Sequence, residues 1–246
     1  MSLPVHLADS LADVAAGSLV EVTGDEAHHA VAVRRLRVGE QVVLTDGAGT
    51  AGTGTVEETD KRLFTVRLSG VRRVERPAPE LVVVQAIPKG DRGELAVEVL
   101  TEIGVARIVP WAAARSVAVW KGERAARSLA RWRSTAHEAG KQARRVWAAE
   151  VGDVARTEEV ADLVAGADLA LVLHEAASSA WGGLTVPSDG TVLLVVGPEG
   201  GLTDEEVAVF EAAGARTVRM GAEVLRTSTA GVAAAAALLA RTSRWG

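Results

Sequence analysis

Apolar and polar positions follow two different rhythms along the chain, and the first rhythm covers residues 1–73. Short alternating stretches at Gln41–Asp46, Thr53–Glu58 and Phe64–Arg72 are separated there by turns rich in Gly and Asp. Alternation at every second position is typical of strands with one buried face. One helical stretch, EAHHAVAVRRL, interrupts this region, and Asp25 stands where it could cap the helix. The pattern predicts a small β-barrel.

The second rhythm begins at Leu81, where continuous apolar runs of strand length alternate with helical segments. The apolar runs predict strands at 81–87, 107–111, 167–173, 191–196 and 215–219. Helices are expected at 90–103, 121–147, 203–213 and 226–240. Apolar strands that alternate with helices indicate a mostly parallel α/β sheet covered on both faces.

The extended segment VERPAPE lies between these two regions. Its prolines disfavour helix in the residues that precede them, as expected of a linker. A chain of 246 residues is long enough for two small domains. We therefore expect a first domain at 1–73, a linker at 74–80 and a second domain at 81–246.

Composition excludes several classes of protein. Hydrophobic residues make up 48% and charged residues 24%, which is typical of a folded chain. The absence of cysteine excludes disulfides, thiolate zinc sites and a cysteine nucleophile. No two histidines have the HExxH spacing, so no metal site is expected. The start of the chain does not resemble a signal peptide, and the longest apolar run, Ala230–Ala240, is too short to cross a bilayer. These features predict a cytoplasmic protein without a membrane segment.

The net charge of −5 hides a basic segment between residues 121 and 145. This segment has only two acidic residues, Glu123 and Glu138. It has eight basic residues, namely Lys121, Arg124, Arg127, Arg131, Arg133, Lys141, Arg144 and Arg145. Local positive charge neutralises phosphates even where the net charge of the chain is negative. The segment therefore predicts contact with nucleic acid, and the alternative is a solvated helix face.

A glycine-rich turn follows the strand predicted at 191–196, in LLVVGPEGGLTDEE. Thr203 and Glu206 have the spacing of a capping box, which marks the start of a helix. Ligands bind at the carboxyl ends of parallel strands, where this turn lies. The turn lacks the lysine of a phosphate-binding loop, and carboxylates follow it, so the ligand expected here is neutral or cationic. A tight turn without a ligand would use the same glycines.

Two more loops leave predicted strands. The stretch MGAEVLRTSTAG passes into an alanine-rich helix, and its hydroxyls at Thr227, Ser228 and Thr229 could cap that helix. A well-capped core helix without a ligand is the alternative. In LVLHEAA, His174 and Glu175 could form a polar pair at the edge of a pocket, or could simply lie on the surface.

These three loops, as LVLHE, LLVVGPEGGLTDEEV and MGAEVLRTSTA, closely resemble the RsmE-type methyltransferases of the SPOUT superfamily, which methylate N3 of a uridine in 16S ribosomal RNA. The resemblance extends upstream to VQAIPKGDRGELAVEVLTEIGVARIVPW (84–111) and RWRSTAHEAGKQARRVWAAEV (131–151). It also includes DEAHHAVAVRRLRVGEQVVLTDGAG (25–49), which is similar to the N-terminal PUA-like barrel of that family. Nearly the whole chain is covered.

The resemblance implies an α/β SPOUT domain with a C-terminal trefoil knot, preceded by a PUA-like β-barrel that binds RNA. It also implies S-adenosylmethionine bound in the knot and a homodimer. Matching positions in the three loops give the expected cofactor-binding residues as Leu173, His174, Gly197, Glu199, Gly200, Gly201, Met220, Gly221, Leu225, Arg226, Thr227, Thr229 and Ala230. Expected RNA contacts are Arg34, Arg35, Lys89, Arg92, Lys141, Gln142, Arg144 and Arg145.

The implied reaction sets requirements on catalytic side chains. N3 of uracil carries a proton that must leave, so a base or a cation that stabilises the imide anion should lie beside it. Arg226 is the candidate cation and Glu199 the candidate base. This chain has Ser228 where many members have a glutamate, and Ala149 where many have a proline. No carboxylate at position 228 is therefore available for catalysis.

Three alternatives remain open from the sequence. The first is a SPOUT enzyme that acts on tRNA or on a ribose 2′-hydroxyl. The second is a non-enzymatic RNA-binding adaptor, which S-adenosylmethionine would not stabilise against heat. The third is a nucleotide-binding α/β protein, which the missing phosphate-loop lysine disfavours. Our prediction is methylation of N3 of a uridine in the decoding region of 16S rRNA, within the small ribosomal subunit, during ribosome maturation.

Overall fold

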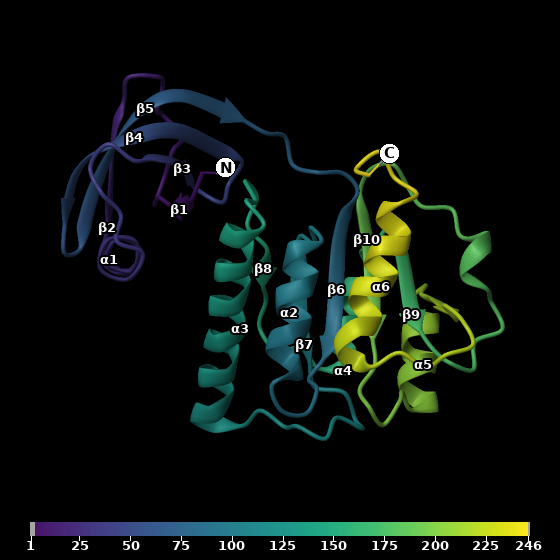
Figure 1. Ribbon diagram of the computed structural model, residues 1–246. Coiled ribbons are helices and arrows are strands. Elements are labelled where there is room, and N and C mark those ends of the chain that lie inside the picture. Colours follow the sequence, from purple (N-terminus) through teal and green to yellow (C-terminus); the bar gives the residue numbers. More distant parts are fainter. Residues whose placement is uncertain (1–2, 246) are drawn as a thin grey trace. The chain divides into compact units, whose positions relative to one another are not determined.

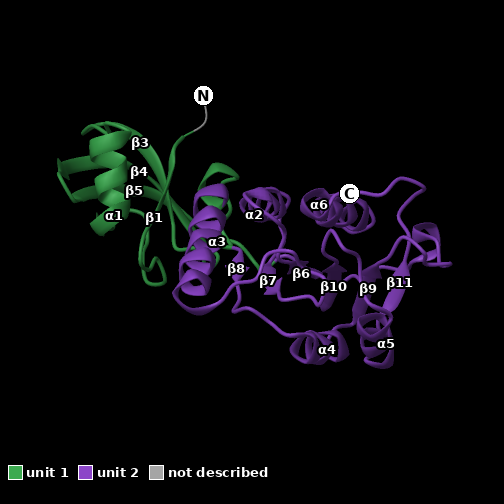
Figure 2. Cartoon of the chain, turned by 90° about the horizontal axis from the view of Figure 1, so that it is seen from below, with its two compact units in different colours: residues 1–76, 140–148 green, residues 77–139, 149–246 purple. Residues whose placement is uncertain are grey.

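The computed structural model describes residues 3–245, which form two compact units (Figure 2). The first unit comprises the chain up to Arg76 together with Gly140–Ala148. The second comprises Pro77–Ala139 and the chain from Ala149 onward. The segment 140–148, which we expected in the second domain, thus clusters with the first unit.

The first unit contains a five-stranded sheet with the order β1-β3-β4-β5-β2. Its strands are β1 (Val5–Leu7), β2 (Leu19–Thr23), β3 (Gln41–Thr45), β4 (Thr50–Asp60) and β5 (Leu63–Arg73). Pairing is antiparallel except between β1 and β3, and β1 and β2 form the two ends of this strand order. The alternating stretches that predicted strands are found in β3, β4 and β5, whereas β1 and β2 were not predicted.

The helical stretch of the first unit begins one residue before Asp25. Helix α1 (Gly24–His28) continues directly into the π-helical turn η1 (His29–Val33). Thr23 occupies the N-cap position without a side-chain hydrogen bond, so the prediction that Asp25 caps this helix is wrong. The Asp25 carboxylate instead accepts a hydrogen bond from Nη2 of Arg62 over 2.6 Å.

Residues 140–148 are tied to the first unit by backbone and side-chain hydrogen bonds. The N–H of Gly49 donates to the carbonyl oxygen of Val146 over 3.1 Å, and the indole N–H of Trp147 donates to that of Val74 over 2.9 Å. A Cβ on Gly49 would lie 2.5 Å from the Trp147 ring, so only glycine fits there. Helix α3 (Gly122–Gln142) ends before this contact, five residues earlier than predicted, and Arg144 then has a φ of 54°.

The second unit contains a six-stranded sheet in which all neighbouring strands are parallel (Figure 1). Its order is β11-β9-β10-β6-β7-β8. The strands are β6 (Glu80–Ala86), β7 (Arg107–Trp111), β8 (Glu150–Val151), β9 (Leu169–Leu173), β10 (Thr191–Val196) and β11 (Arg216–Val218). The parallel α/β sheet predicted from the apolar runs is confirmed.

Helices cover both faces of this sheet, as Figure 2 shows. Helices α2 (Arg92–Glu102), α3 and α6 (Thr227–Leu239) lie on one face, and α4 (Thr157–Ala165) and α5 (Asp204–Ala212) on the other. Successive side chains of a strand point to opposite faces. Accordingly, Val83 of β6 is buried in the core with Trp132 of α3, and Val84 in the core with Phe210 of α5.

The helices α2, α5 and α6 lie within two residues of their predicted bounds. Helix α4 and strand β8 were not predicted, although Val160 and Val164 have helical spacing and are buried on α4. No helix among residues 3–245 is long and apolar enough to cross a membrane.

Candidate functional site

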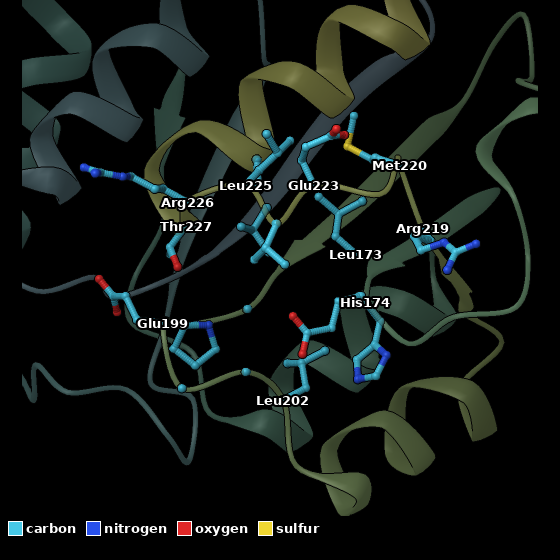
Figure 3. Close-up of a pocket in the computed structure, with 18 of the residues that line it drawn as sticks. Leu173, His174, Glu199, Leu202, Arg219, Met220, Glu223, Leu225, Arg226 and Thr227 are labelled. Atoms are coloured by element: carbon cyan, nitrogen blue, oxygen red, sulfur yellow. The ribbon is translucent and has the colours of Figure 1, made fainter.

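Strands β9, β10 and β11 are neighbours in the sheet, and a loop leaves the carboxyl end of each. These three loops line a pocket with a volume of about 610 Å³ (Figure 3). Ligands of open parallel sheets bind at this edge, because adjacent loops can diverge there. The sheet topology thus brings together three loops that are separate in the sequence.

The turn after β10 is held by the loop that follows β7. Nη1 of Arg115 donates a hydrogen bond to the carbonyl oxygen of Leu202 over 3.1 Å and a longer one to that of Gly200. A Cβ on Gly200 would lie 2.9 Å from Cβ of Arg115 and 3.0 Å from its carbonyl oxygen. Gly201 has a φ of 72°, which residues with a Cβ rarely adopt. Gly200 is therefore required by its close approach to Arg115, and Gly201 by its backbone conformation.

The capping box predicted at the start of α5 is confirmed. The Thr203 hydroxyl accepts a hydrogen bond from the N–H of Glu206, and Oε2 of Glu206 accepts one from the N–H of Thr203 over 2.9 Å. Oε1 of Glu206 also accepts from the N–H of Ala114 over 2.8 Å, and the residue is only 4% exposed. Backbone and Thr203 hydrogen bonds lower the pKa of Glu205 below its ordinary value, so this end of α5 already carries negative charge.

The loop after β11 passes directly into helix α6. Arg226 occupies the N-cap position without a side-chain hydrogen bond, so the prediction of hydroxyl capping is wrong. Thr227 and Ser228 instead lie buried in the first turn, and Oγ1 of Thr229 donates to the carbonyl oxygen of Arg226. Nε2 of Gln85, a fully buried residue of β6, donates to the carbonyl oxygen of Thr227 over 3.2 Å and holds this turn on the sheet.

The loop after β9 contributes Leu173, His174 and Glu175 to the pocket. The N–H of His174 donates to the carbonyl oxygen of Val218 over 3.0 Å, which continues the pairing between β9 and β11. The His174 ring is partly exposed. In Figure 3, His174 and Arg219 lie on one side of the pocket and Glu199 and Arg226 on the other.

Opposite charges are balanced around the pocket. Its lining contains four carboxylates, on Glu175, Glu199, Asp204 and Glu223. It also contains four guanidinium groups, on Arg92, Arg115, Arg219 and Arg226. A site with this mixture suits a ligand that carries both charges, whereas a phosphate cradle would be mainly positive.

All the expected cofactor-binding residues line this pocket except Thr229, which is exposed and points its hydroxyl at the backbone of Arg226. Both candidate catalytic residues, Glu199 and Arg226, are among them. Oε1 of Glu199 accepts a hydrogen bond from the N–H of Lys89 over 3.1 Å, so its carboxylate faces the loop after β6. The guanidinium of Arg226 has no ion-pair partner among residues 3–245.

Sequence reasoning missed Arg115, Arg219 and Glu223 as residues of this site. A usable signal existed for Arg115, because it follows the strand predicted at 107–111 and hence lies at the same edge of the sheet. Arg219 is the last residue of the strand predicted at 215–219 and hence also lies at that edge. Their roles depend on which strands are neighbours, and the sequence did not indicate the strand order.

A second pocket, of about 630 Å³, adjoins the first. Its lining comprises Lys89, Gly90, Asp91, Arg92, Leu95, Val117 and Glu199. Arg92 and Glu199 belong to both pockets. Of the expected RNA contacts, Arg92 therefore lines both pockets and Lys89 lines the second.

The other expected RNA contacts belong to the first unit. Arg34, Arg35, Gln142 and Arg144 are exposed, and Arg145 is partly buried, with its Nε donating to the carbonyl oxygen of Trp147. Nζ of Lys141 lies 2.9 Å from Oε2 of Glu26, and the Lys141 side chain is only 10% exposed. Since its ammonium is already paired and largely buried, we do not retain Lys141 as an RNA contact.

Comparison with known proteins identifies the family. The RNA methyltransferase domain family matches residues 75–239, and the RNA methyltransferase PUA domain family matches residues 22–69. The chain is 42% identical over 241 residues to the ribosomal RNA small subunit methyltransferase E of Mycobacterium bovis. The matched residues cover 96% of this chain and 91% of that relative.

Solved structures agree with this assignment. A methyltransferase from Legionella pneumophila with bound SAM is 29% identical, has a TM-score of 0.89, and matches 98% of this chain and 99% of its own. A ribosomal RNA small subunit methyltransferase E from Neisseria gonorrhoeae, bound to S-adenosyl methionine, is 27% identical with a TM-score of 0.85, and 97% of each chain is covered. The resemblance inferred from the loop motifs is confirmed: the chain belongs to the RNA methyltransferase family and carries that family's PUA domain.

Proposed function

We propose that this chain transfers a methyl group from S-adenosylmethionine to N3 of a uridine in the decoding region of 16S rRNA, as a step of ribosome maturation. The observation that carries the proposal is the pocket built by the loops after β9, β10 and β11. Relatives named for methylation of small-subunit rRNA, two of them with identities of 42% and 27%, support the choice of substrate.

The pocket fits S-adenosylmethionine in size and charge. The cofactor carries a sulfonium cation, an amino group and a carboxylate, and the pocket offers four carboxylates and four guanidinium groups in about 610 Å³. Its apolar part, with Leu173 and Leu225, suits an adenine ring. When bound, the cofactor supplies an electrophilic methyl group on sulfur.

The residues of this chain would orient the two reactants and manage the proton of N3. Methyl transfer is an in-line displacement, so a fixed geometry and exclusion of water contribute most of the acceleration. Glu199 is the proposed base, because its carboxylate is oriented by the N–H of Lys89 at the edge of the pocket. Arg226 is the proposed cation, because its guanidinium has no ion-pair partner among residues 3–245 and lies on the same side of the pocket in Figure 3.

We further propose that the second unit contains a trefoil knot. The connection between β9 and β10 comprises residues 174–190. It accepts hydrogen bonds from one residue that precedes α6 and from another that follows α6. Before α6, the N–H of Arg219 donates to the carbonyl oxygen of Ser179 over 3.1 Å. After α6, the guanidinium of Arg241 donates to the carbonyl oxygen of Gly182 over 2.8 Å. These contacts support a connection that encircles the chain leading into α6.

The first unit would hold the RNA outside the active site. Arg34, Arg35, Gln142 and Arg144 are exposed on it and can contact phosphates. We also propose a homodimer, which the exposed apolar side chains of Val119 and Val224 in the second unit support. A ribosomal RNA substrate would locate the protein in the cytoplasm.

Two measurements test the proposed function. Calorimetric titration of the protein with S-adenosylmethionine should give a saturable one-site isotherm. Mass mapping of 16S rRNA from a strain that lacks this gene should find one unmethylated uridine, which the purified protein and cofactor convert to its N3-methyl form. Failure to bind the cofactor would overturn the proposal, and a methyl group found on tRNA or on a ribose would change the substrate.

A further inference from the structure

The second pocket has the composition of a nucleobase site. Two exposed apolar side chains line it, Leu95 of α2, 44% exposed, and Val117 from the loop after β7, 61% exposed. Enzymes that act on a single base take it out of the stack and hold it between apolar or aromatic side chains. Within residues 3–245, Leu95 and Val117 are the apolar side chains that line this pocket.

Two of the four charged residues that line the second pocket also line the first. Arg92 and Glu199 line both pockets, and Lys89 and Asp91 line the second. Arg92 is exposed, and its guanidinium has no ion-pair partner among residues 3–245. Glu199 is fixed from the backbone of the loop after β6, because the N–H of Lys89 donates to it over 3.1 Å. One cation and one oriented carboxylate therefore stand where the contents of the two pockets would meet.

We propose that the second pocket receives the uracil base of the substrate, with Leu95 and Val117 against its faces and Arg92 at a carbonyl oxygen beside N3. The inference rests on the proposed function and adds to it a base-binding subsite. Arg92 would then be a second cation beside the uracil imide, in addition to Arg226, which lines only the first pocket. With the base so placed, N3 faces the first pocket across the border formed by Arg92 and Glu199.

The chemistry balances with these groups. A bond forms between N3 and the methyl carbon as the bond from that carbon to sulfur breaks, and the electron pair of the broken bond stays on sulfur. The N3 proton passes to the Glu199 carboxylate. Negative charge that develops on the uracil carbonyl oxygen beside N3 during proton removal is stabilised by the positive charge and the N–H donors of the Arg92 guanidinium.

The test is the pH dependence of single-turnover methylation, measured with cofactor-saturated protein on small subunits that lack the methyl group. We expect Arg92→Ala to lower the rate at neutral pH by about tenfold to a thousandfold, the usual effect of removing one electrostatic stabiliser. The lost rate should return as pH rises, by about tenfold per pH unit, because hydroxide then removes the N3 proton without help. Arg92→Lys should recover part of the rate, since it keeps the charge but loses the planar fork.

Matched measurements separate the inference from the function on which it rests. Arg216→Ala removes an exposed arginine of β11 that lines neither pocket, and it should leave the rate and its pH dependence unchanged. Leu95→Ser should raise the concentration of subunits needed for half-maximal rate, with the cofactor affinity unchanged. An Arg92→Ala enzyme with wild-type rate, or with a low rate that does not recover at high pH, overturns the inference while the proposed function stands.

A second copy of the chain is the other possible occupant of this pocket. If Leu95→Ser converts a dimer to monomers, the apolar side chains belong to an interface and the inference fails. If the wild-type protein binds no cofactor or methylates no RNA, the proposed function itself fails. These two results are distinguishable because one concerns a variant and the other the wild-type chain.

Discussion

Nη1 of Arg115 lies 3.1 Å from the carbonyl oxygen of Leu202, and this hydrogen bond joins the loop after β7 to the glycine-rich turn after β10. The two residues are separated by more than eighty positions, but both follow strands of the same parallel sheet. Arg115 thereby supports the glycine-rich turn, and both Arg115 and this turn line the first pocket.

We expect Arg115→Ala to weaken S-adenosylmethionine binding by about tenfold or more, because the turn loses both hydrogen bonds from this guanidinium and a hydrogen bond to a charged group is worth about 1.5–3 kcal/mol. The thermal midpoint of the free protein should fall only slightly, since the residue lies at the edge of the fold. Calorimetry of the variant measures the first effect and circular dichroism the second. An unchanged cofactor affinity would mean that the turn keeps its shape without Arg115.

Substitution of the glycines in this turn should produce graded effects. Gly200→Ala brings a Cβ to 3.0 Å from a backbone oxygen of Arg115, which cannot rotate away, so we expect the largest loss of cofactor affinity there. Gly201→Val has space but would be strained at a φ of 72°, at a cost of about 1–2 kcal/mol. Gly197→Val meets the flexible side chain of Leu202 at 3.3 Å and should have the smallest effect of the three.

Calorimetry on the three glycine variants should rank their affinities in this order, with circular dichroism spectra like that of the wild type. Affinities equal to that of the wild type in all three variants would contradict the assignment of this turn to cofactor binding.

Glu206 should contribute to stability rather than to binding. Its buried carboxylate accepts hydrogen bonds from the N–H groups of Thr203 and Ala114 through different oxygens. Glu206→Gln would replace one acceptor by a donor that faces an N–H, and we expect the free energy of unfolding to fall by about 1–3 kcal/mol. Glu158→Gln, at an exposed position in the first turn of α4, serves as the control and should have little effect in the same denaturant titration. Equal midpoints for both variants would argue against this role of Glu206.

Features of this structure that depend on residues close together in the sequence could be predicted, whereas features that depend on contacts between distant residues could not. The capping box of Thr203 and Glu206 was predicted correctly, because its residues are three positions apart and the pattern is local. The strands at 107–111 and 191–196 were also predicted correctly, because a strand buried on both faces must be apolar throughout. The early end of α3 was missed, since it depends on Trp147 packing against Gly49, almost a hundred residues away.

The candidate site shows the same difference between local features and features that depend on distant residues. The three loops were found because each has its own motif, and family resemblance supplied their common ligand. Arg115 and Arg92 were not assigned to the first pocket, because that assignment requires the order of the strands and the contents of neighbouring loops. Hydroxyl capping of α6 was predicted wrongly, since burial of Thr227 and Ser228 in the first turn could not be seen from residue type alone.

RNA binding by the first unit should depend on exposed arginines that have no ion-pair partner among residues 3–245. We expect Arg34→Glu and Arg144→Glu each to weaken RNA binding and to reduce the slope of log K against log salt by about one, because one fewer counterion is released. Arg62→Ala is the control, since its guanidinium already pairs with Asp25. Filter binding of an rRNA fragment over a range of salt concentrations measures the slope. A slope equal to that of the wild type would mean that these arginines do not contact phosphate.

Arg226 should affect catalysis far more than cofactor binding. It is the N-cap residue of α6, it lines the first pocket, and no carboxylate among residues 3–245 pairs with its guanidinium. Arg226→Lys keeps the charge but loses the planar fork, so we expect single-turnover methylation to slow by about tenfold to a thousandfold. Cofactor affinity and oligomeric state should change little, because the side chain makes no hydrogen bond to any other residue of the range 3–245. A variant with wild-type turnover would remove Arg226 from the mechanism, and a variant that no longer binds cofactor would assign it to the structure of the pocket instead.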